Sequence, residues 1–378
     1  MARRIHGMAL GVLGALLVQA LLNRRAIPRL ARMRPGTRRA AVLIPARNEA
    51  GTIAASIEAW AGQDHPDYEV VVLDDDSCDG TAAIARAVAA RFPHVRVVSG
   101  GPLAPGWHGK PFACHRLRAQ TDAPVLVFAD ADVRPARGAL TRLVGALQQM
   151  SASVVSALPR HAPARPVLWA ALGLQNWAAM TLVPVWLQRW WRAPALTATN
   201  GQVLAIERAA YDRIGGFASV RGTVAEDTAL GRRLARLGHD VRLVDGTSLI
   251  ACHAYADLPA LWRGNVRNLH AVLFGSTALG VAGALALSAL YVAPILLLAA
   301  GGIRGRSTST WLCGAEVALG YLTRLLSDRR AGYPGALSLL HPLSVAMLAG
   351  MLIESARRAA TRRPVEWRGR HYLVQDAR

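Results

Sequence analysis

The chain has 378 residues, of which 52% are hydrophobic, and a formal net charge of +20. Its mean hydropathy of +0.23 is too high for an ordinary soluble enzyme, and the most apolar stretches lie near the two ends. We find no nucleic-acid-binding motif, so a basic chain with apolar stretches is expected to meet anionic lipid and no nucleic acid. Four scattered cysteines without a CxxC pair are typical of reduced thiols in the cytoplasm.

The first apolar stretch runs from Ile5 to Leu22 without a charged residue. At about 1.5 Å per residue it is long enough to cross a hydrocarbon core of about 30 Å. No small-x-small cleavage site precedes Asn23, which favours a retained anchor at residues 1–23 over a signal peptide. The arginine-rich linker at residues 24–38 then places the following domain in the cytoplasm by the positive-inside rule.

From residue 39 onwards, apolar strands alternate with helical stretches. Strands are expected at 40–44, 69–73, 95–98 and 125–128, with helices at 51–61 and 80–91, the second capped by Asp79. This spacing predicts an α/β fold with a parallel, doubly wound sheet. Ligands bind such sheets outside the carboxyl ends of the strands. A shared polar crevice is therefore expected from the acidic residues that follow these ends: Glu49, Asp74, Asp75, Asp130 and Asp132.

Asp130 and Asp132 follow the strand at 125–128 with one residue between them. In an extended chain both side chains point to the same side, where two unneutralised carboxylates repel each other. A divalent cation such as Mg²⁺ or Mn²⁺ relieves that repulsion, since carboxylate oxygens are its preferred ligands. Alternatively, Asp132 caps a helix that begins near Pro135, and Asp130 is solvated beside it. The pair alone leaves both interpretations open.

The second half of the soluble region is less regular. Residues 167–191 are rich in tryptophan, which is compatible either with a packed core helix or with a helix at the membrane surface. A strand is expected at 199–206, a short helix at 208–214, and a helix at 228–237 that Glu226 and Asp227 precede. Acidic residues in a first helical turn usually interact with the helix dipole.

Two further spans are expected near the C-terminus, at 277–300 and at 335–353, the second kinked at Pro342. The stretch 311–326 contains Glu316 and Arg324, and a charge at a helix centre costs about 2.5–3.5 kcal/mol on insertion scales. We therefore expect that stretch to be re-entrant or interfacial; the alternative is a full third crossing, which would place the basic tail outside. Two crossings within residues 276–353 return the basic tail, residues 354–378, to the cytoplasmic face of a multi-pass protein.

An ordered series of motifs resembles family-2 glycosyltransferases over residues 39–275. The series is Pro45-Ala46-Arg47-Asn48-Glu49, Asp74-Asp75-Asp76-Ser77, Asp130-Ala131-Asp132 (a DXD motif), Gly215-Gly216-Phe217 and Glu226-Asp227. Gly106 to Lys110 and the tail Val365 to Tyr372 are similar to a membrane-anchored branch that includes carotenoid (diaponeurosporenoate-type) and hopanoid-associated glycosyltransferases. The resemblance implies a nucleotide-sugar-binding, GT-A-like domain at 39–275.

The resemblance also implies roles for the site residues. Pro45, Ala46 and Glu49 border the nucleotide, and Asp75 contacts the uracil. Asp130 lies near the ribose and the metal, and Asp132 binds the metal that bridges the diphosphate. Asp227, beside Glu226, is the general base, and a single displacement inverts the anomeric configuration. Two residues keep alternatives: Lys110 neutralises the diphosphate or is a solvated loop lysine, and His253 is a metal or phosphate ligand or a structural histidine.

One departure from the family pattern narrows the function. The processive (Gln/Arg)-x-x-Arg-Trp signature is not met at residues 261–268, although Arg263 and Arg267 share a helix face that can meet the diphosphate. We expect an inverting, metal-dependent hexosyltransferase that moves one sugar from a UDP-sugar, UDP-glucose in the first place, to a carotenoid- or hopanoid-like lipid in the cell membrane. Two alternatives stay open: a processive or polyprenyl-phosphate-linked polysaccharide synthase, and a catalytically inactive membrane scaffold.

Overall fold

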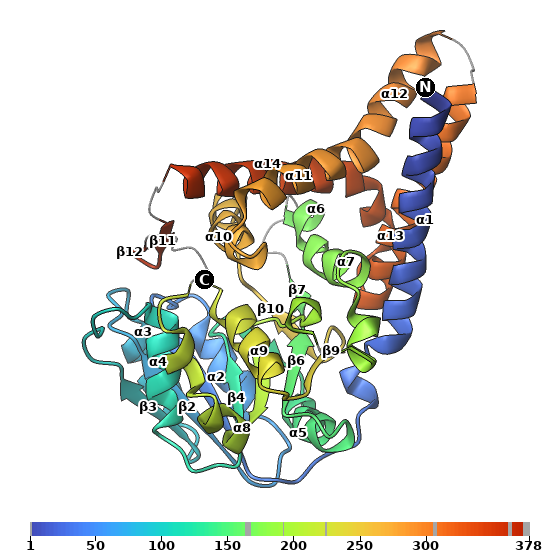
Figure 1. The fold of residues 1–378 in the computed structure, drawn as a ribbon. Helices are drawn as coiled ribbons and strands as arrows, with labels where there is room; N and C mark the ends of the chain where they lie inside the picture. Colours follow the sequence, from blue (N-terminus) through green and yellow to red (C-terminus); the bar gives the residue numbers. More distant parts are fainter. Residues whose placement is uncertain are drawn as a thin grey trace.

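The computed structural model describes residues 2–162, 168–191, 193–223, 225–304, 308–361 and 365–372. An α/β domain occupies one end of the molecule, and a group of long helices extends away from it (Figure 1). The first helix and the C-terminal third of the chain supply these long helices, as the two apolar ends of the sequence predict.

The central sheet has seven strands in the order β3-β2-β1-β4-β8-β6-β9. In chain order the strands are β1 (Ala40–Ala46), β2 (Tyr68–Asp74), β3 (Val95–Ser99), β4 (Val125–Ala129), β6 (Val154–Leu158), β8 (Val203–Glu207) and β9 (Val241–Asp245). The first four are parallel, as predicted, but β8 runs antiparallel to both β4 and β6. The all-parallel prediction is therefore wrong at β8, because a strand buried on both faces has the same apolar pattern in either direction.

Helices cover both faces of the sheet, which confirms the doubly wound arrangement. Alternate residues of β1 show the division: Val42 packs into the core on one face, and Leu43 packs into the core on the other. The first face carries α2 (Ile53–Ala61), α3 (Thr81–Ala89) and α5 (Ala139–Gln149), and the second carries α4 (Gly109–Arg118), α8 (Arg208–Arg213) and α9 (Glu226–Arg236). Short 3₁₀ helices are η1 (Leu30–Arg32), η4 (Pro194–Leu196) and η5 (Gly216–Val220).

Two predicted helix caps differ from the structure. Gly80, not Asp79, is the N-cap of α3, although Asp79 still accepts hydrogen bonds from the backbone N–H groups of Thr81 and Ala50, both at 3.1 Å. Asp132 caps no helix: it precedes β5 (Val133–Pro135), and α5 begins only at Ala139. β5 joins a small sheet with β10 (Ile250–Cys252) and β7 (Arg160–His161), so Asp132 is held between two sheets.

The tryptophan-rich stretch forms three short helices rather than one. They are α6 (Trp169–Leu172), α7 (Leu174–Thr181) and η3 (Val185–Arg189). Trp177 is fully buried and its indole N–H donates to Thr323 Oγ1 at 3.2 Å, whereas Trp190 and Trp191 are 72% and 68% exposed. Each of the two interpretations left open by the sequence therefore fits a different part: α7 belongs to the core, and the following segment presents indole rings at the surface.

Within the residues that the structure describes, three segments are long and apolar enough to cross a membrane: Arg3–Ala26, Thr277–Ala300 and Gly335–Ala360. The first segment lies on α1 (Ala2–Ala26). The second lies on α11 (Thr277–Leu287), the π-helical turn η6 (Ser288–Val292) and α12 (Ala293–Arg304). The third lies on η7 (Gly335–Leu340) and α14 (His341–Ala360). Pro342 lies in the first turn of α14, where proline is tolerated, directly after the point at which the span changes from the 3₁₀ helix η7 to α14. Figure 1 shows α11 and α14 lying across α10 (Leu258–Val272), while α12 reaches toward the N-terminus.

The stretch 311–326 is not a re-entrant loop, because it lies within a continuous helix, α13 (Thr308–Ala331), beside α1 (Figure 1). Its charged residues have partners inside the helix bundle. Glu316 Oε1 lies 2.9 Å from His6 Nδ1 of α1, and Arg324 Nε lies 2.8 Å from Asp328 Oδ1. An insertion scale treats each charge as unpaired in lipid, so it overstates the cost of burying charges that face one another.

Candidate functional site

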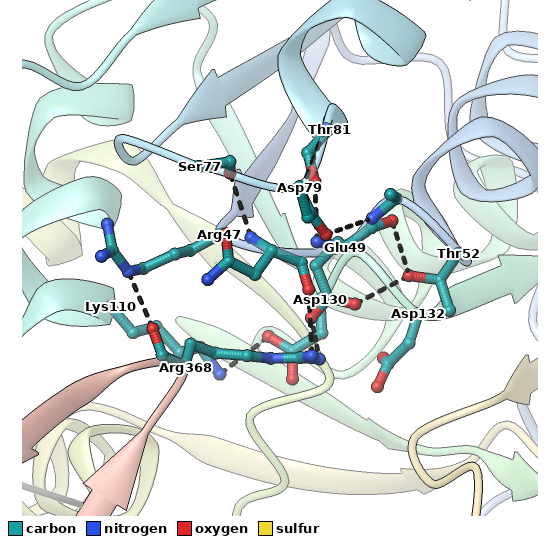
Figure 2. Close-up of polar contacts among 12 residues, drawn as sticks. Arg47, Glu49, Thr52, Ser77, Asp79, Thr81, Lys110, Asp130, Asp132 and Arg368 are labelled. Atoms are coloured by element: carbon teal, nitrogen blue, oxygen red, sulfur yellow. Dashed lines mark hydrogen bonds and ion pairs between the residues drawn. The ribbon is translucent and has the colours of Figure 1, made fainter.

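Acidic residues from three adjacent strands meet at one edge of the central sheet. β2, β1 and β4 are neighbours in that order, and backbone hydrogen bonds continue past their ends: Asp75 N–H donates to Ala46 O at 2.8 Å. The carboxylates of Glu49, Asp130 and Asp132 lie close together in Figure 2. The shared polar crevice predicted from the strand ends is therefore present, and it is built from residues that are far apart in the sequence.

Lys110 lies at the centre of this crevice and not on a solvated loop. It occupies the first turn of α4, where its Nζ lies 2.7 Å from Asp130 Oδ1 and 3.0 Å from Glu226 Oε1. Burial lowers the pKa of Lys110, but these two carboxylates more than offset burial and hold the pKa well above its usual range. The chain's single lysine is thus a permanent cation that links the end of β4 to the start of α9.

Asp132 is the least neutralised carboxylate of the group. Its side chain is 9% exposed, and its Oδ1 accepts a weak hydrogen bond from Cys252 Sγ at 3.5 Å. Burial first, and then the charges of Asp130 and Glu49, raise the pKa of Asp132 to about 7. A buried carboxylate beside other carboxylates has the chemistry of a divalent-cation ligand, so Asp130 and Asp132 fit a Mg²⁺ or Mn²⁺ site.

The structure does not bring His253 into that pair. Its backbone N–H donates to Asp132 O at 2.9 Å, while burial and the charges of Arg134 and Arg160 lower the pKa of its ring. Among the residues the structure describes, the one group of three or more candidate ligands with all atoms within 4.8 Å of one another is His6, Cys313 and Glu316, far along the helices. His253 as a third ligand therefore remains a prediction.

Glu226 and Asp227 begin α9 on the other side of Lys110. Glu226 is buried and paired with Lys110, whereas Asp227 is partly exposed. Burial, followed by the charge of Glu226, raises the pKa of Asp227 to about 6, while Lys110 opposes the shift. Asp227 lines one small pocket together with Pro45, Lys110, Asp130 and Gly201. The pocket joins the proposed metal and nucleotide residues to an aspartate whose pKa suits a general base near neutral pH.

Gly201 provides the space that Asp227 occupies. A Cβ added at residue 201 would lie 2.8 Å from Asp227 Cβ and 2.9 Å from its Cγ. The sequence pattern predicts this glycine on a strand and indicates no role for it, whereas the structure places it in the turn before β8. Its importance depends on a contact between distant segments, which no local pattern contains.

The predicted nucleotide residues differ in how open they are. Pro45 lines the pocket, whereas the side chain of Ala46 is buried in the core. The backbone carbonyl of Ala46 accepts a hydrogen bond from the backbone N–H of Asp75. Burial raises the pKa of Glu49, and the nearby Arg368 opposes that shift. Asp75 is almost fully buried: burial raises its pKa, and a hydrogen bond and ion pair with Arg370 oppose the rise. Arg368 and Arg370 come from the C-terminal tail, and sequence analysis assigned them no contact with the site.

The two arginines predicted to share a helix face do lie on α10, but they differ in surroundings. Arg263 is exposed, while Arg267 is partly buried. Burial lowers the pKa of Arg267, and the charges of Tyr255, Glu226 and Asp130 raise it. Arg267 therefore lies near the acidic crevice.

Comparison with known proteins agrees with this geometry. The model of the family described as glycosyl transferase family 21 matches residues 17–378. The chain belongs to glycosyl transferase family 21. It is therefore a glycosyltransferase, and the resemblance to carotenoid-type glycosyltransferases that its motifs suggested is confirmed.

Two bacterial relatives carry the name 4,4'-diaponeurosporenoate glycosyltransferase. The protein of Staphylococcus aureus (strain MRSA252) is 26% identical over 341 residues, which cover 88% of each chain. The protein of Staphylococcus haemolyticus (strain JCSC1435) is 25% identical over 247 residues, which cover 62% of each chain. A solved mannosyltransferase from Pyrobaculum calidifontis, in complex with GDP-Man and Mn²⁺, superposes with a TM-score of 0.53 at 20% identity, covering 94% of this chain and 99% of that one. This likeness supports the GT-A-like fold.

Proposed function

We propose that this glycosyltransferase moves a single sugar from a UDP-sugar, with UDP-glucose as the first candidate, to a carotenoid-like lipid in the cell membrane, with inversion at the anomeric carbon. The observation that carries the proposal is the position of Asp227. Its carboxylate, with a pKa raised to about 6, faces the same pocket as Lys110 and Asp130. An acceptor group and a donor diphosphate placed in that pocket would lie on opposite sides of the transferred sugar.

The donor half of the site would hold the nucleotide and a divalent cation. Asp130 and Asp132 are the residues that would bind Mg²⁺ or Mn²⁺, and the bound cation supplies a positive charge that stabilises the departing diphosphate. Lys110, already a fixed cation beside Asp130, would contact the same diphosphate. Pro45 and Glu49 would border the nucleotide. Asp75 would meet the uracil only through the acceptor positions that its pairing with Arg370 leaves. His253 remains a candidate additional ligand.

The acceptor half of the site is built around Asp227. Above its raised pKa, near pH 6, the carboxylate is ionised and would accept the proton of an acceptor hydroxyl group as that hydroxyl attacks; an acceptor carboxyl group is already ionised at this pH and would attack without a base. Glu226 would act indirectly, because it holds Lys110 in place at 3.0 Å. For a hydroxyl acceptor, removing the proton in the same step as bond formation is what a single, inverting displacement requires.

The lipid nature of the acceptor is supported by the relatives' names and by the surface of the helices. Apolar side chains are exposed on α11 and α14, including Leu279, Leu285, Leu343 and Ile353. In our proposal three helical segments cross the bilayer: α1, the continuous helical segment 277–304 (α11, η6 and α12), and α13. α14 lies along the membrane surface above the α/β domain, which replaces the predicted crossing at 335–353 (Figure 1). The arginines that follow α1 then keep the α/β domain on the cytoplasmic side, and the tail returns to the same side.

A transfer assay with membranes that contain the protein tests this proposal. We expect label from UDP-[¹⁴C]glucose to enter the organic phase when 4,4'-diaponeurosporenoate is supplied, and chromatography to show one added sugar. Parallel reactions with GDP-[¹⁴C]mannose test the choice of donor. If no label enters any lipid with either donor, the proposal fails, and a labelled polymer would favour a processive synthase instead.

A further inference from the structure

The C-terminal tail ends in a β-hairpin that reaches the acidic crevice. β11 (Val365–Trp367) pairs antiparallel with β12 (Arg370–Tyr372), and the loop between them is Arg368-Gly369. Both loop residues have positive φ, 49° and 79°, as a type I′ turn requires. Arginine is unfavourable in this left-handed conformation, and such strain persists where surrounding contacts hold it. The conformational preference of arginine therefore does not explain Arg368 at the tip of the hairpin, and contacts with the rest of the protein must hold it there.

Contacts with the ends of β1 and β2 hold the hairpin. Arg368 Nη1 donates to Asn48 O at 3.0 Å, and its Nη2 forms an ion pair with Glu49. Arg47 Nε donates in return to Arg368 O at 3.1 Å. Figure 2 shows the Arg368 guanidinium directed at the Glu49 carboxylate, beside Asp130. The tip of the tail is thus part of the crevice wall.

The two arginines of the hairpin differ in how firmly they are held. Arg370 binds the buried carboxylate of Asp75 through both of its terminal nitrogens, with Nη2 at 3.2 Å from Oδ1. Its side chain is 15% exposed, whereas that of Arg368 is 36% exposed. Arg370 therefore holds the hairpin against the end of β2. Arg368 keeps an open side toward the crevice, and a guanidinium has five N–H donors with which to hold Glu49 and another anion together.

We propose that the hairpin completes the donor site: Arg370 fastens it to Asp75, and Arg368 binds the diphosphate of the nucleotide. This inference rests on the proposed function, because it assumes a nucleoside-diphosphate donor. Planar guanidinium groups bind phosphate oxygens with two parallel hydrogen bonds, which suits a diphosphate better than a nucleobase. Arg267 of α10 lies close enough for the charge of Arg368 to lower its pKa, so Arg368 would add to an existing group of cations.

Calorimetric titration of the purified full-length protein in detergent with Mn²⁺ tests the role of Arg368. We expect Arg368→Met to weaken UDP binding by about tenfold or more and to leave uridine binding unchanged, because uridine lacks the diphosphate. Arg368→Lys should restore part of the affinity. Arg358→Met is the matched control: it removes the same charge from α14, where Arg358 pairs with Glu354 of its own helix, and UDP affinity should stay within about twofold of wild type.

The role of Arg370 is tested separately by proteolysis. Arg370→Met should release the hairpin, increase tryptic cleavage after Arg368 and weaken UDP binding. UDP binding by Arg368→Met that equals or exceeds wild type would overturn the inference, and tighter binding would identify the hairpin as a plug. If the wild-type protein binds neither UDP nor GDP in the presence of Mn²⁺, the proposed function fails as well. Wild-type UDP binding with an unaffected Arg368→Met variant refutes the hairpin alone.

Discussion

Replacing Gly201 with alanine should damage transfer without unfolding the protein. The added Cβ would meet Asp227 Cβ at 2.8 Å, Cγ at 2.9 Å and Oδ2 at 3.0 Å. Carbon atoms in ordinary contact are about 3.5–4.0 Å apart, so Asp227 has to move by roughly 1 Å. Gly201 does not have a positive φ, so alanine is compatible with its backbone and the steric effect falls on the proposed base.

A displacement of about 1 Å in a catalytic group costs about a hundredfold in rate, so we expect kcat to fall by about that factor. The KM for the UDP-sugar should change little, because the three atoms nearest to the new methyl group all belong to Asp227. The assay is transfer of [¹⁴C]glucose to the lipid acceptor at varied donor concentration, with the melting temperature of each variant measured in detergent.

Gly51→Ala is the matched control. Gly51 also lies near the donor site, but an added Cβ there meets nothing within 4 Å, and its φ is not positive. This variant should keep wild-type kcat. A Gly201→Ala protein that folds normally and transfers at a rate within about twofold of wild type would refute the reasoning, because Asp227 would then tolerate displacement and could not be the base.

Three further predictions concern charged groups. The pKa of Asp227 is raised to about 6 and the base works ionised, so kcat/KM should fall about tenfold per pH unit below that value; a profile that is flat down to pH 5 contradicts this. The pKa of Asp132 is raised to about 7, so Mn²⁺ affinity measured by titration should rise about tenfold from pH 6 to pH 8, and equal affinities at both pH values would exclude Asp132 as a ligand. In the metal-free protein the same pKa shift should make the free energy of unfolding fall as pH rises from about 4 through 7. Arg324→Met should lower the free energy of unfolding in detergent by about 3–5 kcal/mol, because the Asp328 carboxylate stays buried without its guanidinium partner. Arg358→Met, which breaks the more exposed pair with Glu354, should lower it by less than about 1 kcal/mol, and equal losses for the two variants would refute the buried pairing.

The sequence predicted the parts of the fold that depend on local patterns. Strand ends at Ala46, Asp74 and Ala129 were found to within two residues, because buried β-strands followed by acidic residues form a strong local signal. Since parallel strands share an edge, the meeting of Glu49 with Asp130 followed from topology alone. The antiparallel direction of β8 did not follow, because a strand that is apolar on both faces has no direction in its composition.

What the sequence missed depends on contacts between distant segments. The sequence leaves two interpretations of Lys110, a diphosphate ligand and a solvated loop residue, because only the fold places its two carboxylate partners around it, from β4 and α9. Arg368 and Arg370 lie about 300 residues from Glu49 and Asp75, so no spacing rule connects them. Glu316 counted against a membrane helix because its partner, His6, lies 310 residues earlier. In each case the sequence does not identify the oppositely charged partner, because that partner is far along the chain.

The most direct test is one transfer reaction with purified protein, UDP-[¹⁴C]glucose and a hydroxyl-bearing carotenoid, whose proton a base must remove, run with wild type and with Asp227→Asn. The account predicts a labelled glycolipid of inverted anomeric configuration from wild type in the presence of Mn²⁺. It predicts none from Asp227→Asn, although that variant should still bind UDP. Near-normal product formation by Asp227→Asn, or a product that retains the donor's configuration, would contradict the central claim that Asp227 is the base of a single displacement.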